Sequence, residues 1–92
     1  MNFEWDSKKE RCNRRKHRVS FEEAAAVFGD PLALTYPDPD HSEAEQPFIT
    51  VGMSAAKRTL LVAHTDRDDR IRIISARLAT KRERQHYEES NE

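Results

Sequence analysis

Apolar and polar residues alternate in five short runs of the chain, and a period of two is typical of β-strands. The runs are residues 2–5 (NFEW), 32–36 (LALTY), 48–54 (FITVGMS), 59–65 (TLLVAHT) and 70–76 (RIRIISA). Short turns at 55–58 and 66–69 join the last three runs, which favours an antiparallel meander. The loop from Pro37 to Pro47 holds three of the four prolines, so we expect it to be exposed.

Three helices are predicted where capping residues precede segments that lack this alternation. Asp6 can cap a helix over 7–17, whose only clear hydrophobe is Cys12, so we expect this helix on the surface or at the border of a groove. Ser20 with Glu23 and Thr80 with Glu83 form two capping boxes, which predict helices over 20–28 and 81–89. The buried stripe of the second helix is expected to hold Phe21, Ala24, Ala25 and Phe28, and Gly29 should end it.

These elements follow the order β-α-α-β-β-β-β-α. We expect one α+β domain over residues 1–92, in which helices pack on one face of a small antiparallel sheet. Trp5, Phe21, Phe28 and Ile73 are expected to share its hydrophobic core. A chain of 92 residues builds only a modest core, so its stability can depend on a partner.

The charge distribution is more informative than the net charge, which is −1. Seven basic residues lie between Lys8 and Arg18, and seven more lie between Arg67 and Arg84. The loop between these blocks carries acidic residues and neither Lys nor Arg. A surface divided in this way fits RNA, DNA or an acidic protein, and it equally fits a solvated charged face.

Several other classes of protein are disfavoured. Cys12 is the only cysteine, so no internal disulfide can form, as is usual in a reducing cytoplasm. No apolar run approaches the roughly 20 residues that span a bilayer, and the first ten residues do not resemble an export signal. The only glycines are Gly29 and Gly52, which excludes a glycine-rich phosphate loop. No spacing of histidines and acids predicts a metal site, and we expect no cofactor.

Arginines interrupt the last strand. Arg72 alternates with the isoleucines on either side of it, so it should point away from the core. Arg77 lies where the strand ends and can turn toward the same cleft. The planar guanidinium of arginine grips phosphate oxygens, which makes both residues candidates for binding an anion. The alternative is that both pair with acids such as Asp66 or Asp69 on a solvated face.

The segments KHRVSFEEA, DPLAL, RIRIISAR and RERQHYE occur in this order and resemble the BrnT family of toxins from bacterial type II toxin–antitoxin systems. The resemblance extends from Phe3 to Glu89. It departs at Arg18, where a small residue such as glycine is expected, and we expect a local change in the turn between the first two helices. The resemblance implies a RelE-like fold and a cytoplasmic ribonuclease that needs neither metal nor cofactor and inhibits translation.

The resemblance also implies a protein partner. This is a BrnA-like antitoxin with a ribbon-helix-helix part, which forms a hetero-oligomer with the toxin and alone contacts operator DNA. A toxin dimer is a further possibility. The alternative reading is a non-catalytic basic module, a degenerate toxin that acts only as antitoxin partner and co-repressor.

Cleavage of RNA without metal needs a base, an acid and a group that stabilises charge on the phosphorane. The catalytic candidates that the resemblance implies are His17, Arg72, Arg77, Glu83 and Tyr87. The candidates for binding RNA are Arg70, Lys81, Arg82 and Arg84. Glu83, Tyr87 and His17 each have a structural alternative: Glu83 can serve the capping box, Tyr87 can pack the last helix, and His17 can interact with its helix end. In an active role, His17 could form one hydrogen-bonded site with Asn13, which lies four residues earlier on the same helix face. Of the other histidines, His64 is a core or edge residue, and His41 and His86 should be exposed.

Overall fold

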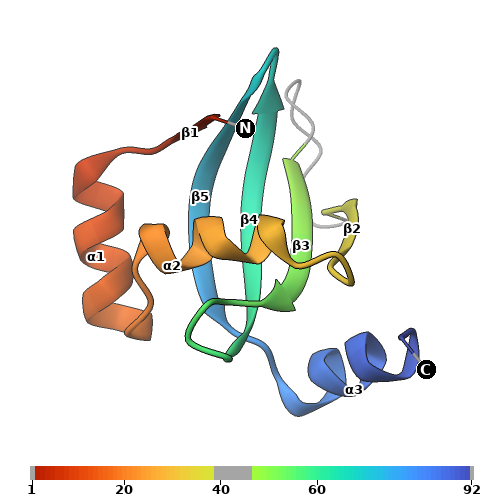
Figure 1. Cartoon of the computed structure of the whole chain (residues 1–92). Coiled ribbons are helices and arrows are strands. Elements are labelled where there is room, and N and C mark those ends of the chain that lie inside the picture. Colours follow the sequence, from red (N-terminus) through yellow and green to blue (C-terminus); the bar gives the residue numbers. More distant parts are fainter. Residues whose placement is uncertain (1, 39–46, 92) are drawn as a thin grey trace.

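A computed structural model describes residues 2–38 and 47–91 of the chain (Figure 1). Its elements are β1 (Asn2–Glu4), α1 (Ser7–His17), α2 (Phe21–Ala26), the 3₁₀ helix η1 (Val27–Gly29), β2 (Leu34–Pro37), β3 (Pro47–Met53), β4 (Thr59–Arg67), β5 (Arg70–Leu78) and α3 (Lys81–Glu89). The helices lie where the caps predict them, except that the last turn of the second helix is 3₁₀. None of the helices in these two ranges is long and apolar enough to cross a membrane. Most of the predicted exposed loop, with His41, lies outside the described residues.

The five strands form one mixed sheet in the order β1-β5-β4-β3-β2, and with the helices they make an α+β domain. Neighbouring strands are antiparallel from β2 to β5, as the short turns predict. The first strand, however, pairs in parallel with β5, so the expectation of a purely antiparallel sheet is wrong at this edge. Most of the chain separates β1 from β5, and such a long connection leaves the chain free to return in the parallel sense.

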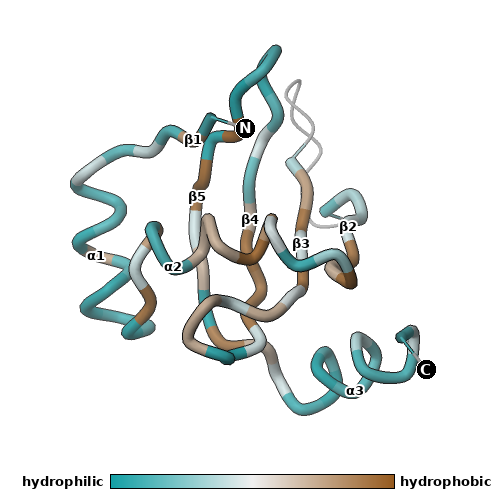
Figure 2. The backbone as a smooth tube through the Cα atoms, in the orientation of Figure 1, coloured by the Kyte–Doolittle hydropathy of each residue, from teal (hydrophilic) through white to brown (hydrophobic). Residues whose placement is uncertain are grey.

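One face of the sheet carries the main core under α2, which crosses the strands in Figure 1. The fully buried members of this core are Val19, Phe21, Ala24, Val27, Leu60, Val62, Ile73 and Ala76. Ala25 and Phe28 are only partly buried, because the 3₁₀ turn places Val27 three residues after Ala24 on the core side. Figure 2 shows the same contrast, with apolar residues along the strands and polar residues over most of α1 and α3.

The expectation that Trp5 belongs to this core is wrong. Its side chain is 36% exposed and meets Phe21 edge to face, with ring centroids 6.0 Å apart. It follows Glu4, the last residue of β1, so the sheet no longer directs it inward. Phe3, which is still within β1, packs against Phe28 at 5.4 Å instead.

The three helices do not share one face of the sheet, contrary to the prediction. Helix α2 and the 3₁₀ helix η1 cover the main core, whereas α1 lies beside β5 (Figure 1). There the side-chain amide of Asn13 donates to the carbonyl of Ala76 at 2.8 Å and accepts from its N–H at 3.1 Å, as a neighbouring strand would. Helix α3 reaches the opposite face, where Tyr87 packs with Val51 and Leu61. This difference leaves part of the second face uncovered by helices.

A β-bulge in β5 changes which residues share a face. Ala63 pairs with Ser75 and His64 pairs with Ile73, so Ile74 is an extra residue without a counterpart on β4. Strict alternation predicts that Ser75 shares a face with Ile73, but the core contains Ile73 and Ala76. The bulge thus turns Ser75 and Arg77 toward the face opposite the core, which Arg72 also occupies.

The turn between α1 and α2 depends on Arg18 and on Arg58. Arg18 adopts the left-handed conformation that glycine favours at a helix C-terminus, with φ of 59°. Its carbonyl accepts a hydrogen bond from Arg58 at 3.1 Å. Arg58 also forms an ion pair with Glu23, whose carboxylate accepts from the hydroxyl of Ser54 at 2.7 Å. The hydroxyl of Ser20 accepts from the N–H of Glu23 as predicted, but the predicted capping box is wrong in its second half, because the carboxylate of Glu23 binds Arg58 and Ser54 instead of the N–H of Ser20.

The Glu23 network predicts a specific dependence of stability on pH. Hydrogen bonding to Arg58 lowers the pKa of Glu23 below its ordinary value of 4.5. The contribution of ionised Glu23 to the free energy of unfolding is therefore complete above pH 4.5, and it is lost as the pH falls through the lower pKa of the folded chain. Glu23→Gln should therefore lower the free energy of unfolding at pH 7. The difference in this free energy between the variant and the native chain should become smaller below pH 4.5. Urea unfolding measures this difference, and Glu22→Gln at an exposed position of the same helix is the control. A difference that is constant with pH would contradict the assigned role.

Candidate functional site

The sheet face opposite the core is the candidate site, and three cross-strand rows define it. One row runs from Leu34 through Val51 and Leu61 to Arg77, and the next runs from Tyr36 through Ile49 and Ala63 to Ser75. A third row brings Pro47, Thr65, Arg72 and Glu4 together. Cross-strand partners point to the same side of a sheet, so apolar residues form the floor and arginines stand along β5. We call this surface the open face.

Arg77 is held on the open face by Glu83, which α3 presents from its first turn. The guanidinium of Arg77 donates two hydrogen bonds to the carboxylate, at 2.9 and 3.0 Å. The same carboxylate accepts from the N–H of Thr80 at 2.8 Å, which completes the predicted capping box. The hydrogen bonds from Arg77 lower the pKa of Glu83, and Glu83 in turn raises the pKa of Arg77. Glu83 is therefore ionised at neutral pH, and one side of the Arg77 fork is fixed in direction.

A groove of about 400 Å³ lies between α3 and the strands β2 and β3. Its lining residues are Leu34, Tyr36, Val51, Arg82, Glu83 and His86. Burial raises the pKa of Tyr36, and the charge of Glu83 adds to this effect, so its phenol stays protonated at neutral pH. Sequence reasoning missed Tyr36, although an exposed aromatic residue on a short strand beside a proline could have been noticed. The groove thus joins an aromatic ring, an imidazole, a guanidinium and a carboxylate.

Arg72 shares the open face with Arg77 but not its immediate surroundings. They are five positions apart along β5, which places their Cα atoms about 16 Å apart. The nearest acid is Glu4, whose carboxylate lies 3.9 Å from Arg72 and 3.7 Å from Arg70. Neither Asp66 nor Asp69, the acids named as alternatives, forms these pairs; Asp66 contacts His64 at 3.1 Å. The two arginines therefore form separate cationic positions on the open face.

Tyr87 has a structural position. It is 6% exposed, packs on Val51 and Leu61, and donates its hydroxyl to Asp30 at 2.5 Å. Burial and this hydrogen bond raise the pKa of Tyr87 to about 12. Burial raises the pKa of Asp30, but hydrogen bonds from Tyr87 and two backbone N–H groups outweigh it and lower that pKa overall. These contacts correspond to the packing role that the sequence also allowed for Tyr87.

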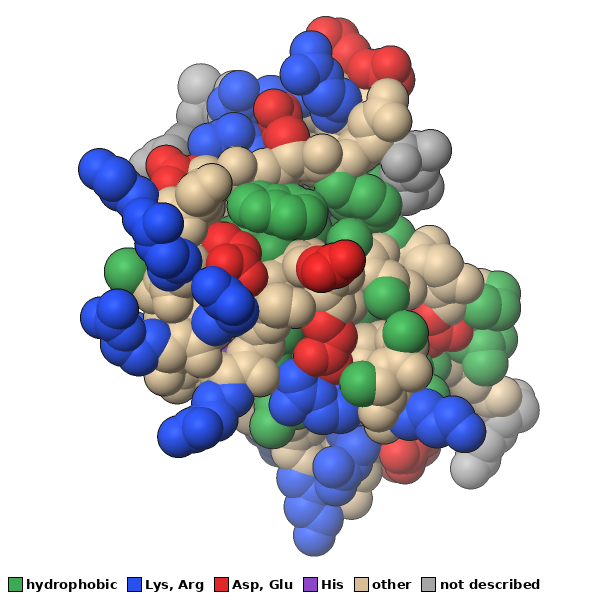
Figure 3. All heavy atoms as spheres, turned by 60° about the vertical axis from the view of Figure 1, so that its left-hand side comes forward, with side chains coloured by type: hydrophobic (Ala, Val, Ile, Leu, Met, Phe, Trp, Pro, Cys, Tyr) green, Lys and Arg blue, Asp and Glu red, His purple; other side chains and the backbone are tan. Residues whose placement is uncertain are grey.

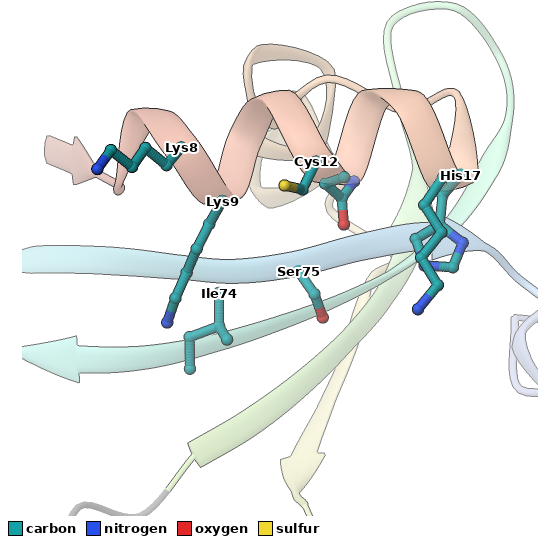
Figure 4. Close-up of a pocket in the computed structure, with 8 residues that line it drawn as sticks. Lys8, Lys9, Cys12, His17, Ile74 and Ser75 are labelled. Atoms are coloured by element: carbon teal, nitrogen blue, oxygen red, sulfur yellow. The ribbon is translucent and has the colours of Figure 1, made fainter.

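His17 lies away from the groove at α3. It lines a second groove, of about 340 Å³, between α1 and β5 (Figure 4). Asn13 borders the same groove, but its amide is engaged by the backbone of Val19 and Ala76, so it is not a hydrogen-bonding partner of His17. The structure therefore brings together Arg77, Glu83 and Arg82, and it places His17 with the cations of α1.

The family match decides which class of protein this site belongs to. Residues 5–83 match the model of the family described as "Ribonuclease toxin, BrnT, of type II toxin-antitoxin system". The chain belongs to the BrnT family. Its structure is similar to the crystal structure of the Brucella abortus ribonuclease toxin BrnT, with a TM-score of 0.68 and 20% sequence identity over 88% of this chain and 99% of that one. Among curated proteins, none matches the sequence.

Membership of the BrnT family identifies the chain as a toxin of the ribonuclease class and implies an antitoxin partner. The similarity to the Brucella protein supports the fold, a five-stranded mixed sheet with three α-helices. Neither comparison assigns a role to a residue. The placement of the predicted site residues therefore rests on the geometry alone.

The other candidates of this BrnT toxin are dispersed. Lys81, Arg82 and Arg84 are exposed on α3, but only Arg82 lines the groove beside Glu83. His86 is exposed there, as predicted. His64 is a satisfied core residue, 2% exposed, with its Nε2 2.8 Å from the hydroxyl of Thr50. Burial lowers the pKa of His64, against the influence of Asp66, so this imidazole is neutral at pH 7.

The acidic, histidine and cysteine side chains do not form a metal centre in the part of the chain that the structure describes. In residues 2–38 and 47–91, no three His, Cys, Asp or Glu side chains come together as a metal site requires. The expectation of a reaction without metal or cofactor stays a prediction. What the open face offers chemically is a fixed arginine, an ionised carboxylate, a neutral phenol and a solvent-exposed imidazole.

Proposed function

We propose that this BrnT-family chain is a metal-independent, RelE-like endoribonuclease that acts in the cytoplasm and inhibits translation by cutting RNA. The observation that carries the proposal is the Arg77–Glu83 pair on the open face, beside a groove that holds Tyr36 and His86. A guanidinium fixed in direction is preorganised to stabilise charge that develops on a phosphate. An aromatic ring beside it offers a surface for a base to stack on.

The proposed reaction is attack of a ribose 2′-oxygen on the adjacent phosphorus. The bond from phosphorus to the 5′-oxygen breaks, which leaves a 2′,3′-cyclic phosphate and a 5′-hydroxyl. Arg77 stabilises the phosphorane, Glu83 holds Arg77, and Arg72 binds a more distant phosphate. His86 is our candidate for moving the proton from the 2′-hydroxyl or to the 5′-oxygen, because its imidazole lines the groove beside Glu83 and a histidine ring can both accept and donate a proton.

Expression of the chain in bacterial cells, alone and together with the neighbouring gene, tests this function. Alone, the chain should arrest growth and fragment cellular RNA within the same period. Together with an antitoxin encoded beside it, the chain should do neither. Growth arrest with intact RNA would contradict the proposed activity. Absence of both effects would favour the non-catalytic module.

The proposed antitoxin is a BrnA-like protein with a ribbon-helix-helix part, which alone contacts operator DNA. We propose that it forms a hetero-oligomer with the toxin by covering the open face and the exposed cations of α3. Opposite charges speed the encounter of two proteins, and salt screens this effect over about 8 Å at physiological ionic strength. Association should therefore slow with added salt more than dissociation accelerates.

Charge reversal on α3 is expected to weaken this antitoxin contact. Arg82→Glu with Arg84→Glu should slow association and reduce its dependence on salt, because both side chains are exposed on α3 and Arg82 lines the groove. Stopped-flow or surface binding kinetics at several salt concentrations measure both quantities. The matched control is Arg11→Glu with Arg15→Glu on the exposed side of α1. Unchanged kinetics in the α3 variant would show that the antitoxin binds elsewhere.

A further inference from the structure

The groove between α1 and β5 is a second cationic surface that the proposed reaction does not use. One stripe of α1 lines it, where the cations Lys8, Lys9 and Lys16 and the imidazole of His17 recur with helical spacing (Figure 4). The opposite wall is formed by Ile74 and Ser75 of β5. The stripe extends about 12 Å along the helix from Lys8 to Lys16. Figure 3 shows Lys and Arg side chains projecting along the α1 edge of the molecule, with Asp and Glu side chains between them and the apolar patch.

The charge of this groove is not neutralised by the acids of α1. No Asp or Glu is among its lining residues in the described part of the chain. Glu10 is turned away, because its carboxylate contacts Arg14 at 3.1 Å and the N–H of Phe21 at 3.3 Å. Asp6 caps the helix, accepting from the N–H groups of Lys8 and Lys9. A net positive groove remains, which favours an anionic ligand.

Ser75 connects this groove to the open face. It lines the groove, and it also lies in the cross-strand row of Ala63 and Ile49, between the rows of Arg72 and Arg77. The bulge at Ile74 is the cause, since it turns Ser75 away from the core. A chain of phosphates that crosses the sheet edge at Ser75 therefore passes from Arg77 directly to the cations of α1.

We infer that the α1–β5 groove binds the phosphate backbone of single-stranded RNA beside the cleavage position. This inference rests on the proposed ribonuclease function. Lysine suits the task, because its compact charge on a flexible stem follows a backbone without requiring fixed geometry. His17 is then a residue that contacts RNA next to the reacting phosphate. An acidic segment of the antitoxin could use the same cations, but continuity with Arg77 favours RNA.

Equilibrium binding of an uncleavable RNA tests the inference. The probe is a fluorescent single-stranded RNA of about 12 nucleotides with 2′-O-methyl riboses, which lack the attacking hydroxyl. The groove variant is Lys9→Gln with Lys16→Gln. The control is Arg11→Gln with Arg15→Gln, which removes the same charge from exposed positions of α1 that do not line the groove. Circular dichroism and urea midpoints show that both variants fold.

The native chain should bind the probe with an affinity that falls steeply with salt. Losing two phosphate contacts should make the slope of log K against log salt less steep by about 1.4, which is roughly a 25-fold weaker affinity at 0.1 M salt. The control should keep the native slope. Identical values for the two variants, or no binding by the native chain, would overturn the inference. Loss of antitoxin affinity with unchanged RNA affinity would also overturn it in favour of an acidic peptide.

Cleavage of ordinary RNA, measured in parallel, separates this inference from the proposed function. If the native chain binds the probe through the groove but leaves ordinary RNA intact, the assignment of the groove to RNA binding is supported and the catalytic proposal fails. If the native chain cleaves RNA and the groove variant binds like the control, the catalytic proposal stands and the groove assignment fails.

Discussion

Replacing Arg77 by alanine is expected to lower the rate of RNA cleavage about 10²–10³-fold and to abolish toxicity, the usual cost of removing one preorganised donor to a transition state. The chain should stay folded, because Glu83 keeps its hydrogen bond from the N–H of Thr80. Arg77→Lys should recover only part of the loss, since lysine keeps the charge but not the bidentate fork. Single-turnover cleavage of a labelled RNA measures the rate.

Two further variants make the Arg77 result specific. Arg72→Ala should also lower cleavage, since we propose that it holds a second phosphate. Arg11→Ala removes an exposed arginine of α1 that lines neither groove and should leave the rate unchanged. A folded Arg72→Ala/Arg77→Ala double variant that still stops growth would contradict the assignment of the open face.

Replacing Phe21 by alanine is expected to reduce the free energy of unfolding by about 3–5 kcal/mol, a large part of the stability of a small domain. Phe21 is fully buried in the main core, and its ring also supports Trp5. Urea unfolding followed by circular dichroism measures the loss. Leu32→Ala is the control, because Leu32 is 50% exposed.

The same experiment tests the observed face of α2. Phe28 is only partly buried, so Phe28→Ala should cost less than Phe21→Ala. Equal costs would place both rings equally deep, as the sequence alone predicts. A melting temperature unchanged by Phe21→Ala would show that the assigned face of α2 is wrong.

Local signals made much of the fold predictable. The caps Asp6, Ser20 and Thr80 each act within a few residues, and each marks the start of a helix where the sequence predicts it. The parallel pairing of β1 and the bulge at Ile74 depend on contacts between distant segments, which no local pattern encodes. The bulge matters most, because it reverses the side on which Ser75 lies.

The individual residues of the candidate site were predictable from local signals, but their contacts with distant segments were not. Glu83 was expected for its place in the capping box, and Arg77 for its place at the end of a strand, but only the structure joins them. Tyr36 could not be connected with Glu83, since more than forty residues separate them along the chain. Tyr87 and His17 lie in different surroundings. Tyr87 is buried against Val51 and Leu61, whereas the position of α1 beside β5 places His17 in the other groove.

Incubation of the purified chain with RNA in the presence of EDTA tests the central claim most directly. The proposed site predicts that cleavage persists, that the products end in 2′,3′-cyclic phosphates and 5′-hydroxyls, and that Arg77→Ala purified in the same way leaves the RNA nearly intact. RNA that stays whole with the native chain, or cleavage that stops when EDTA is added, would contradict a metal-independent ribonuclease site on the open face.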